Sequence, residues 1–314
     1  MQSQDNISCE IVNRAKVLGC RCFEKEMLKN HVSFKVGGPC SCLISINSAE
    51  SIAELALLCE KLNAPYMIIG KGSNLLIDDN GFDGVVFLMG KDFSQVRLLD
   101  ETTIECEAGA PLSKAAYFAY KSGLTGFEFA WGIPGTVGGA VYMNAGAYGG
   151  EIKDIILSAE YSDKDGKISV FQKNELDLSY RNSVFQCGEY VITKSLFKLE
   201  KGEPEKIRQR MDELLQRRKE KQPLEFPSAG STFKRPDGAF AALLIEQCGL
   251  KGLSVGGAQV STKHSGFVIN KNNASYSDII ALIHKVKEIV YEKTGYQLEC
   301  EVEIISSKNS QEDA

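Results

Sequence analysis

The residues with the clearest chemical potential form a glycine-rich stretch, WGIPGTVGGAVYMNAGAYGGE, at residues 131–151. Seven glycines lie from Gly132 to Gly150, and no charged side chain occurs before Glu151. Because glycine accepts positive φ and has no Cβ to hold a ligand away, such a run can point successive backbone N–H groups at an anion. Two interpretations are open: a pyrophosphate-binding loop, or a tight turn packed on a sheet.

The glycine spacing matches neither of two common phosphate-binding motifs. A P-loop requires a lysine, and a Rossmann fingerprint requires Gly-x-Gly-x-x-Gly, whereas the glycines here stand at positions 132, 135, 138 and 139. A separate glycine turn, GKGSNLL at residues 70–76, is the first of the two in chain order and directly follows a predicted buried strand at residues 66–69. Since α/β sheets bind ligands at the carboxyl ends of their strands, the two turns together favour the ligand-binding interpretation.

Alternating strand and helix signals predict the elements that carry these turns. A strand at residues 42–46 precedes a helix over 49–62, capped by Ser48, and strands at 66–69 and 84–89 complete a first lobe. The apolar face of that helix comprises Ile52, Leu55, Cys59 and Leu62. A second lobe combines a strand-like sequence over residues 96–108, a helix over 111–122, a hairpin of strands 155–161 and 167–171, and a strand over 190–199.

The composition changes after Pro223, which marks the start of a third unit. A helix over 204–221 leads into it, and its basic end suits a helix C-terminus without any ligand. Helices over 239–247 and 278–293 and a last strand over 298–305 follow.

Composition and charge limit the possible functions. The chain has 314 residues, 43% of them hydrophobic and 25% charged, as in ordinary globular proteins. A net charge of −5 gives no reason to expect a nucleic-acid partner. No apolar run is long enough to span a bilayer, and the polar start MQSQDN does not resemble a secretory signal. We therefore expect a cytoplasmic protein without a membrane partner. A monomer is also expected, although no sequence feature determines the oligomeric state.

Five motifs in a fixed order give the chain a resemblance to a known family. They are SFKVGGP, GKGSNLL, GIPGTVGGAVYMNAGAYGGE, YRNS with KQP and AGSTFKRP behind it, and LECEVEII, and they extend from about His31 to Ile305. Each motif is weak alone, but the ordered set is specific. On these residues the chain resembles the UDP-N-acetylenolpyruvoylglucosamine reductases, flavoenzymes of bacterial peptidoglycan synthesis.

The resemblance implies an α+β fold with a two-lobed FAD-binding unit of the vanillyl-alcohol-oxidase (PCMH) type, followed by an α/β substrate-binding domain. Residues 1–90 would form FAD-binding lobe 1, 91–221 FAD-binding lobe 2, and 222–314 the substrate-binding domain. Backbone N–H groups of the two glycine turns would hold the FAD pyrophosphate and ribityl chain. The residues assigned to FAD are Gly70, Lys71, Gly72, Ser73, Asn74, Leu75, Gly132, Pro134, Gly135, Thr136, Gly138, Gly139, Asn144, Gly146 and Ala147.

The resemblance also implies a reaction in two halves, with UDP-N-acetylglucosamine enolpyruvate and NADPH as the partners. NADPH reduces FAD, and the flavin then delivers hydride to the alkene carbon remote from the carboxylate, which leads to UDP-N-acetylmuramate. The enolate-like charge that forms must be stabilised and protonated. A cation, a carboxyl group and a proton donor are therefore required.

Arg181, Ser231 and Glu301 match the family residues for these roles. Arg181 of YRNS can bind a carboxylate bidentately and keep its charge, and Ser231 of AGSTFKRP can donate a proton to a strongly basic enolate. By local sequence alone, Arg181 also fits a surface arginine and Ser231 a turn serine or helix cap. Strand alternation puts Glu299, Glu301 and Glu303 on one face, so the choice of Glu301 rests on the family pattern.

Cationic contacts are implied for a substrate that carries a diphosphate and a carboxylate. The residues assigned to the substrate are Tyr180, Lys221, Lys234 and Arg235. One branch of the family has an inserted loop with a substrate-clamping tyrosine, but here residues 196–202 pass directly to Pro204, so the chain resembles the shorter type. His264 of STKHSGFVIN is expected to be structural.

Three other interpretations are weighed against this one. An FAD-dependent oxidase of the same superfamily often tethers flavin through histidine or cysteine, and neither glycine turn contains histidine. A non-catalytic flavin-binding module would not require the three catalytic residues together. A zinc site is not favoured, because the ten cysteines include no Cys-x-x-Cys pair; free thiols, several packed as small apolar residues, and no metal are expected.

Overall fold

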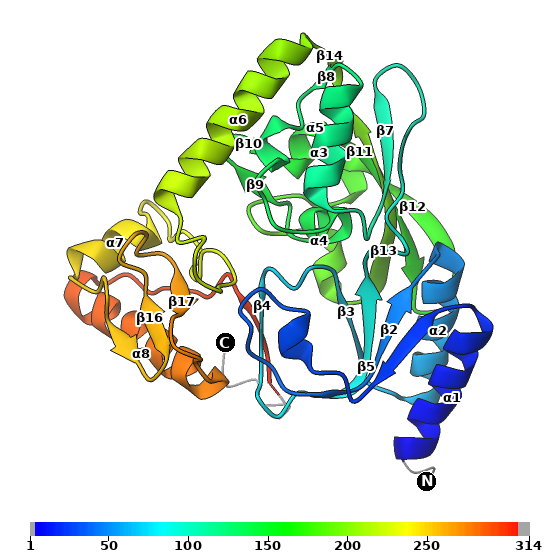
Figure 1. Ribbon diagram of the computed structural model, residues 1–314, viewed down its shortest axis with the longest axis horizontal. Coiled ribbons are helices and arrows are strands. Elements are labelled where there is room, and N and C mark those ends of the chain that lie inside the picture. Colours follow the sequence, from blue (N-terminus) through cyan, green and yellow to red (C-terminus); the bar gives the residue numbers. More distant parts are fainter. Residues whose placement is uncertain (1–3, 307–314) are drawn as a thin grey trace. The chain divides into compact units, whose positions relative to one another are not determined.

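A computed structural model describes residues 4–306, and its contacts divide the chain into two compact units (Figure 1). Unit 1 comprises the chain up to Lys25, then Ser41–Lys71 and Gly84–Arg217. Unit 2 comprises Glu26–Cys40, Gly72–Asp83 and the chain from Arg218 onward. Each unit is therefore built from segments that are far apart in the sequence.

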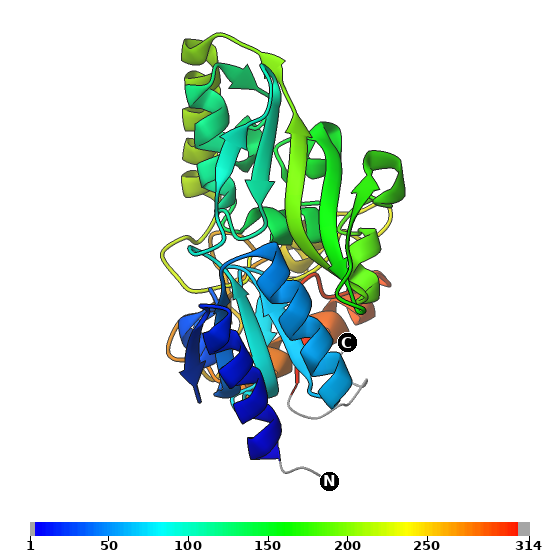
Figure 2. The same cartoon turned by 90° about the vertical axis from the view of Figure 1, so that its right-hand side faces the viewer.

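The first sheet of unit 1 has the strand order β1-β2-β5-β3. These strands are β1 (Arg21–Glu24), β2 (Cys40–Ile46), β5 (Phe82–Met89) and β3 (Tyr66–Ile69). Helices α1 (Gln4–Val17) and α2 (Ala49–Leu62) lie side by side on it, as Figure 2 shows. The predicted helix is confirmed with its cap, since the Ser48 hydroxyl accepts the Ser51 N–H at 3.0 Å. Strands β3 and β5 pair in parallel.

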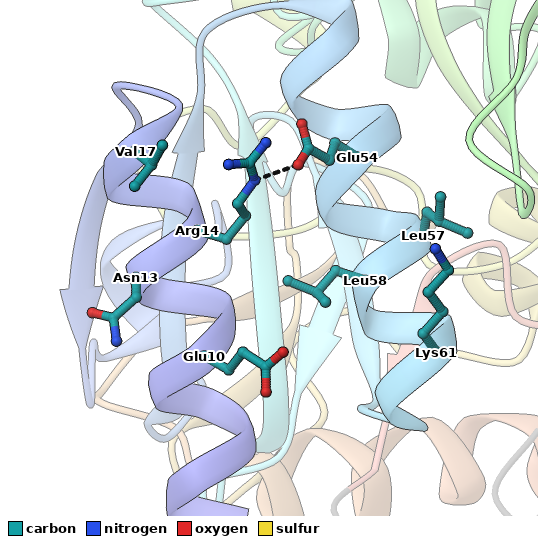
Figure 3. A pocket seen from close by; sticks show the side chains of 8 residues that line it. All are labelled: Glu10, Asn13, Arg14, Val17, Glu54, Leu57, Leu58 and Lys61. Atoms are coloured by element: carbon teal, nitrogen blue, oxygen red, sulfur yellow. Dashed lines mark hydrogen bonds and ion pairs between the residues drawn. The ribbon is translucent and has the colours of Figure 1, made fainter.

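A surface pocket lies between α1 and α2, and Arg14 forms an ion pair with Glu54 beside it (Figure 3). Its lining residues are Glu10, Asn13, Arg14, Val17, Glu54, Leu57, Leu58 and Lys61. None of these residues belongs to the predicted cofactor or substrate sets, so this pocket is separate from the site described below.

The second sheet of unit 1 is antiparallel and has the order β12-β11-β13-β7-β6. These strands are β6 (Val96–Leu98), β7 (Thr103–Glu107), β11 (Ile156–Asp163), β12 (Ile168–Gln172) and β13 (Tyr190–Lys198). The predicted hairpin is confirmed, because Gly166 turns the chain at φ 76° and donates its N–H to the Asp163 carbonyl at 3.0 Å. Phe87 of β5 and Phe197 of β13 are both fully buried in one hydrophobic core, which joins the two sheets.

The glycine-rich stretch folds into short regular elements that the sequence did not predict. They are α4 (Val137–Tyr142), β9 (Gly146–Ala147), β10 (Gly150–Glu151) and α5 (Ile152–Ile155). Glycine is a poor helix former, so α4 depends on its surroundings. Thr136 caps it, and the N–H groups of Val137 and Gly138 donate to the carbonyls of Ala110 and Ala108 at 2.8 Å each.

Unit 2 contains the antiparallel sheet β15 (Ser254–Val255), β16 (Ala258–Val260) and β17 (Val268–Asn270), with helices α7 (Ala241–Gln247) and α8 (Tyr276–Thr294). A capping box of Ser275 and Asp278 starts α8, two residues before the predicted start. The predicted strand over 298–305 is too long. Only β18 (Glu303–Ile305) forms, parallel to β4 (Leu75–Ile77), because residues 299–301 bond to residues 232–234 instead.

Two early segments pack within unit 2 through close backbone contacts. A Cβ on Gly38 would lie 2.1 Å from the Asp79 carbonyl oxygen, and one on Gly81 would lie 1.8 Å from that of Pro39. Phe34 and Leu76 are fully buried in the core of this unit. The glycines of SFKVGGP are therefore required for packing. The predicted division into three parts, residues 1–90, 91–221 and 222–314, stays a prediction.

The remaining elements are short, apart from two helices. They are α3 (Leu112–Lys121), α6 (Pro204–Lys221), β8 (Leu124–Thr125), β14 (Glu200–Lys201), and the 3₁₀ helices η1 (Leu28–Asn30), η2 (Glu128–Ala130), η3 (Lys173–Glu175) and η4 (Val184–Cys187). Within residues 4–306, no helix combines the length and the apolar character that crossing a membrane requires.

Candidate active site

Within unit 1, the first glycine turn touches the glycine-rich stretch. A Cβ on Gly70 would lie 2.3 Å from the Thr136 hydroxyl oxygen and 3.1 Å from its methyl carbon. Thr136 is 3% exposed, and its hydroxyl also accepts the Gly139 N–H at 3.4 Å. The absence of a side chain at Gly70 therefore allows the two predicted cofactor loops to meet.

The glycines of the stretch fall into two groups. A Cβ on Gly138 would lie 2.9 Å from the Ala108 Cβ, and one on Gly146 would lie 2.7 Å from the Glu151 Cβ, so packing alone requires glycine there. A Cβ on Gly149, at φ 91°, would have no neighbour within 4 Å. Gly139 is exposed, and the closest atom to its Cβ would be 3.5 Å away. Packing thus accounts for Gly138 and Gly146, whereas the cofactor-binding role of Gly139 stays a prediction.

These residues fit a cofactor with a pyrophosphate and a long chain. Gly132 and Gly135 are half-buried and Pro134 is exposed, so backbone on this side of the stretch is accessible. The adjoining Trp131 has a buried indole Nε1 without a hydrogen-bond partner in the described chain, an orphaned donor that a bound group would satisfy. The Gly138 N–H is already used by the Ala108 carbonyl, which favours a packing role for Gly138.

Asn144 is fully buried, and its amide is used by the protein itself. Its Nδ2 donates to the Ser179 carbonyl at 2.9 Å and to a Glu151 carboxylate oxygen at 2.8 Å, and its Oδ1 accepts the Lys153 N–H at 2.9 Å. These contacts favour a structural role over direct cofactor binding. Through its hydrogen bond to the Ser179 carbonyl, Asn144 connects the segment that carries Arg181 to the glycine-rich stretch.

Arg181 lies in a tight turn of unit 1. Ser179 and Asn182 exchange backbone hydrogen bonds at 3.3 and 3.2 Å, and Arg181 between them has φ 55°. Its guanidinium carbon lies 5.0 Å from the centre of the Tyr180 ring, a cation–π contact. The predicted cation and the predicted substrate contact Tyr180 are therefore adjacent in space as well as in sequence.

Unit 2 brings Ser231 and Glu301 onto neighbouring segments. The Glu301 N–H donates to the Thr232 carbonyl at 2.8 Å, and the Asn74 amide donates to the Glu301 carbonyl at 3.0 Å. The Asn74 carbonyl in turn accepts the Glu303 N–H at 2.9 Å. Asn74 of the first glycine turn therefore holds the segment that carries Glu301, a role that the sequence did not predict.

The other residues of the first turn lie around Asn74. Lys71 is exposed, Ser73 is half-buried, and Leu75 belongs to β4, where it pairs with Glu303. Gly72 has φ 55°, and a Cβ there would lie 2.6 Å from the His31 carbonyl oxygen. Ala147 of the other stretch is half-buried in β9.

The predicted substrate residues of unit 2 include three cations. Lys234 forms an ion pair with Glu299 at 3.4 Å. Glu299 is one of the three glutamates among which strand alternation could not identify the catalytic residue. The Arg235 guanidinium carbon lies 5.4 Å from the centre of the exposed Phe240 ring. Lys221 is the exposed last residue of α6.

His264 has structural contacts. Its Nδ1 accepts the Gly266 N–H at 3.2 Å, and its ring packs edge-on against Phe267 with centroids 4.9 Å apart. Burial lowers the pKa of His264, and nearby Lys251 lowers it further while Glu246 opposes this. The folded protein thus favours the neutral ring.

A lowered histidine pKa predicts a loss of stability in acid. The unfolded chain takes up a proton near the ordinary pKa of about 6.5 while the folded protein resists it, so this stabilisation is complete above about pH 6.5 and is lost below it. His264→Asn keeps an acceptor for Gly266 but does not titrate. We expect the melting temperature of the unsubstituted protein to fall more between pH 7.5 and pH 5.5 than that of the variant. Parallel decreases would contradict this.

The cysteines are free thiols in the described chain, and six of the ten are buried. Burial raises the pKa of Cys59 to about 12 and that of Cys40 to about 11, so both stay protonated at neutral pH. Among residues 4–306 no group of three or more His, Cys, Asp or Glu side chains is arranged to hold a metal ion.

Comparisons with known proteins identify the family and the cofactor. Residues 222–305 match the family described as UDP-N-acetylenolpyruvoylglucosamine reductase, C-terminal domain, and residues 40–172 match the FAD binding domain, which confirms FAD as the cofactor. A UDP-N-acetylenolpyruvoylglucosamine reductase of Clostridium novyi is 52% identical over 90% of this chain and 92% of its own length. One of Clostridium botulinum is 50% identical over 91% and 92%.

A solved structure confirms the predicted fold class. The UDP-N-acetylenolpyruvylglucosamine reductase of Thermus caldophilus has a TM-score of 0.79 and 36% identity, and the match covers 91% of this chain and 99% of the other. Sequence relatives, domain matches and structure agree over nearly the whole length. The chain belongs to the UDP-N-acetylenolpyruvoylglucosamine reductases, a family of FAD-dependent oxidoreductases.

Proposed function

We propose that this reductase converts UDP-N-acetylglucosamine enolpyruvate into UDP-N-acetylmuramate for peptidoglycan synthesis, with NADPH as the reductant and in the cytoplasm. The observation that carries the proposal is the 52% identity to a named reductase over 90% of the chain. The hydrogen-bonded pair of segments that carry Ser231 and Glu301 supports it from the structure.

The joined glycine loops would hold the cofactor. Gly70 and Lys71 on one side, and Gly132, Gly135 and Gly139 on the other, offer backbone close to a common surface. When bound, FAD supplies the chemistry that carries hydride equivalents from NADPH to the alkene. The polypeptide has to bind, orient and shield the reactants. It also has to stabilise the negative charge of the enolate and supply the proton that the enolate takes up.

Arg181 would stabilise the negative charge that develops on the substrate. As the alkene carbon remote from the carboxylate gains hydride, negative charge spreads onto the carboxylate as an enolate. A guanidinium keeps its own charge throughout and can bind both carboxylate oxygens. This interaction strengthens as charge develops, so it lowers the barrier and does more than bind the ground state.

Ser231 would supply the proton, and Glu301 would supply the carboxyl group of the trio. A serine hydroxyl is a weak acid, but the enolate carbon next to the carboxylate is a strong base, so transfer between them is feasible. Lys221, Lys234 and Arg235 suit the diphosphate and carboxylate of the substrate.

Isotope labelling tests the reaction. In D₂O with NADPH and FAD, we expect a solvent deuterium in the product on the carbon that bears the carboxylate. NADPH that carries deuterium at its transferable position should label the methyl carbon instead. Proton and carbon NMR of the product distinguish the two positions. NADPH-derived deuterium on the carbon that bears the carboxylate would contradict the assigned direction of hydride delivery.

A further inference from the structure

The turn that carries Arg181 has a conformation that requires external support. Its φ of 55° lies in the left-handed region, which residues with a Cβ seldom occupy. Such a conformation persists where the surrounding structure enforces it. The direction of the Arg181 side chain depends on this backbone conformation, so whatever holds the turn also aims the guanidinium.

Gln186 provides a direct support. Its Nε2 donates to the carbonyl of Arg181 at 2.9 Å and to the carbonyl of Tyr142 at 3.3 Å. A primary amide has two N–H donors, so one group can serve both carbonyls. Tyr142 is the last residue of α4 in the glycine-rich stretch. Gln186 thus connects the peptide group after Arg181 to the predicted cofactor-binding segment.

Other residues hold the flanks of the turn. Asn144 binds the Ser179 carbonyl at 2.9 Å, and the Ser183 hydroxyl donates to the Tyr142 carbonyl at 2.7 Å. Both residues are buried, whereas Gln186 is exposed. A change at Gln186 can therefore alter the turn without opening the core of unit 1.

We propose that Gln186 is a positioning residue for the reductase reaction, because it holds Arg181 in its left-handed turn at a fixed place relative to the glycine-rich stretch. The inference rests on the proposed role of Arg181. Since Arg181 would act on the charge that develops in the substrate, loss of Gln186 should affect the half-reaction with the enolpyruvyl substrate. The half-reaction with NADPH does not use this charge.

Two substitutions test the proposal by anaerobic stopped-flow absorbance of the FAD-loaded enzyme. Gln186→Met keeps the length of the side chain but has no donor, and Gln186→Glu presents an acceptor to two carbonyl oxygens. We expect each to slow flavin reoxidation by UDP-N-acetylglucosamine enolpyruvate by about 10- to 100-fold, as for a slightly misplaced catalytic group. Flavin reduction by NADPH should stay unchanged. Gln209→Glu, the same change at an exposed position of α6, is the matched control and should alter neither step.

Thermal denaturation of the FAD-free protein gives a readout that does not depend on activity. Arg181→Gly removes the Cβ that makes the left-handed turn unfavourable. Gln186→Met should therefore lower the melting temperature less in the Arg181→Gly background than in the unsubstituted chain, a non-additive result. FAD affinity, measured by flavin fluorescence, should be the same with and without Gln186→Met.

Three outcomes would overturn the positioning role: unchanged reoxidation in both Gln186 variants, equal slowing of both half-reactions, or weaker FAD binding with additive melting temperatures. The last two would indicate a merely structural contact. If Arg181→Gly itself leaves reoxidation unchanged, the assignment of Arg181 fails, and this inference fails with it. A large effect of Arg181→Gly without any effect at Gln186 would leave the proposed function standing.

Discussion

Ser231→Ala is expected to slow flavin reoxidation by the enolpyruvyl substrate by at least about 100-fold, the lower range for a lost general acid. Flavin reduction by NADPH should stay nearly unchanged, because that half-reaction needs no proton at the substrate carbon. Ser231 is half-buried, next to Thr232, whose carbonyl accepts the Glu301 N–H at 2.8 Å. Removal of one hydroxyl at this place should leave the fold intact.

The two half-reactions separate a lost proton donor from general damage. They are measured by stopped-flow absorbance under anaerobic conditions, with each reactant mixed in turn. Ser94→Ala is a suitable control, because the hydroxyl of this half-buried serine in unit 1 donates locally, to the Lys91 carbonyl at 2.9 Å. Equal slowing of both half-reactions in Ser231→Ala would be incompatible with the assigned role.

Gly70→Ala is expected to weaken FAD binding by at least about tenfold, which corresponds to 1.4 kcal/mol. The added Cβ would lie 2.3 Å from the Thr136 hydroxyl oxygen. Thr136 is a buried β-branched residue, and rotation about its χ1 only exchanges the hydroxyl with another substituent. Overpacking of this kind costs about 1–3 kcal/mol, so the two cofactor loops should move apart.

Thr136→Ala in the same chain provides the matched test. Thr136→Ala alone removes a helix cap and should cost about 1 kcal/mol of stability. In the double variant the nearest Thr136 atom left would be its Cβ, 3.2 Å from the new methyl group, so FAD affinity should recover part of the loss. Flavin fluorescence titration gives the dissociation constants. An FAD affinity of Gly70→Ala equal to that of the unsubstituted protein would refute the shared surface.

Local patterns predicted the regular elements well. The capped helix Ala49–Leu62 has the predicted bounds. Its cap Ser48 and its apolar positions Ile52, Leu55 and Cys59 lie within one short segment, so a local pattern shows them all. The hairpin around Gly166 is equally local. Family motifs predicted the fold class, the cofactor and the reaction class, and relatives over 90% of the chain confirm them.

Long-range contacts were beyond a sequence-based prediction. The segments 26–40 and 72–83 pack in unit 2 because Gly38 and Gly81 let distant backbones approach, and no local pattern shows this. Helix α4 forms in a glycine-rich sequence because Ala108 and Ala110 bind its first N–H groups. Gln186 carries no motif at all, and its role follows only from the two carbonyls that it contacts.

The central claim is that this protein is an FAD enzyme that passes electrons from NADPH to an enolpyruvyl ether. The most direct test is an anaerobic two-step absorbance measurement on the FAD-loaded protein. Addition of NADPH should bleach the flavin absorbance, and subsequent addition of UDP-N-acetylglucosamine enolpyruvate should restore it rapidly. Bleaching without recovery would contradict the proposed substrate. A protein that shows no flavin spectrum after reconstitution with FAD would contradict the cofactor site itself.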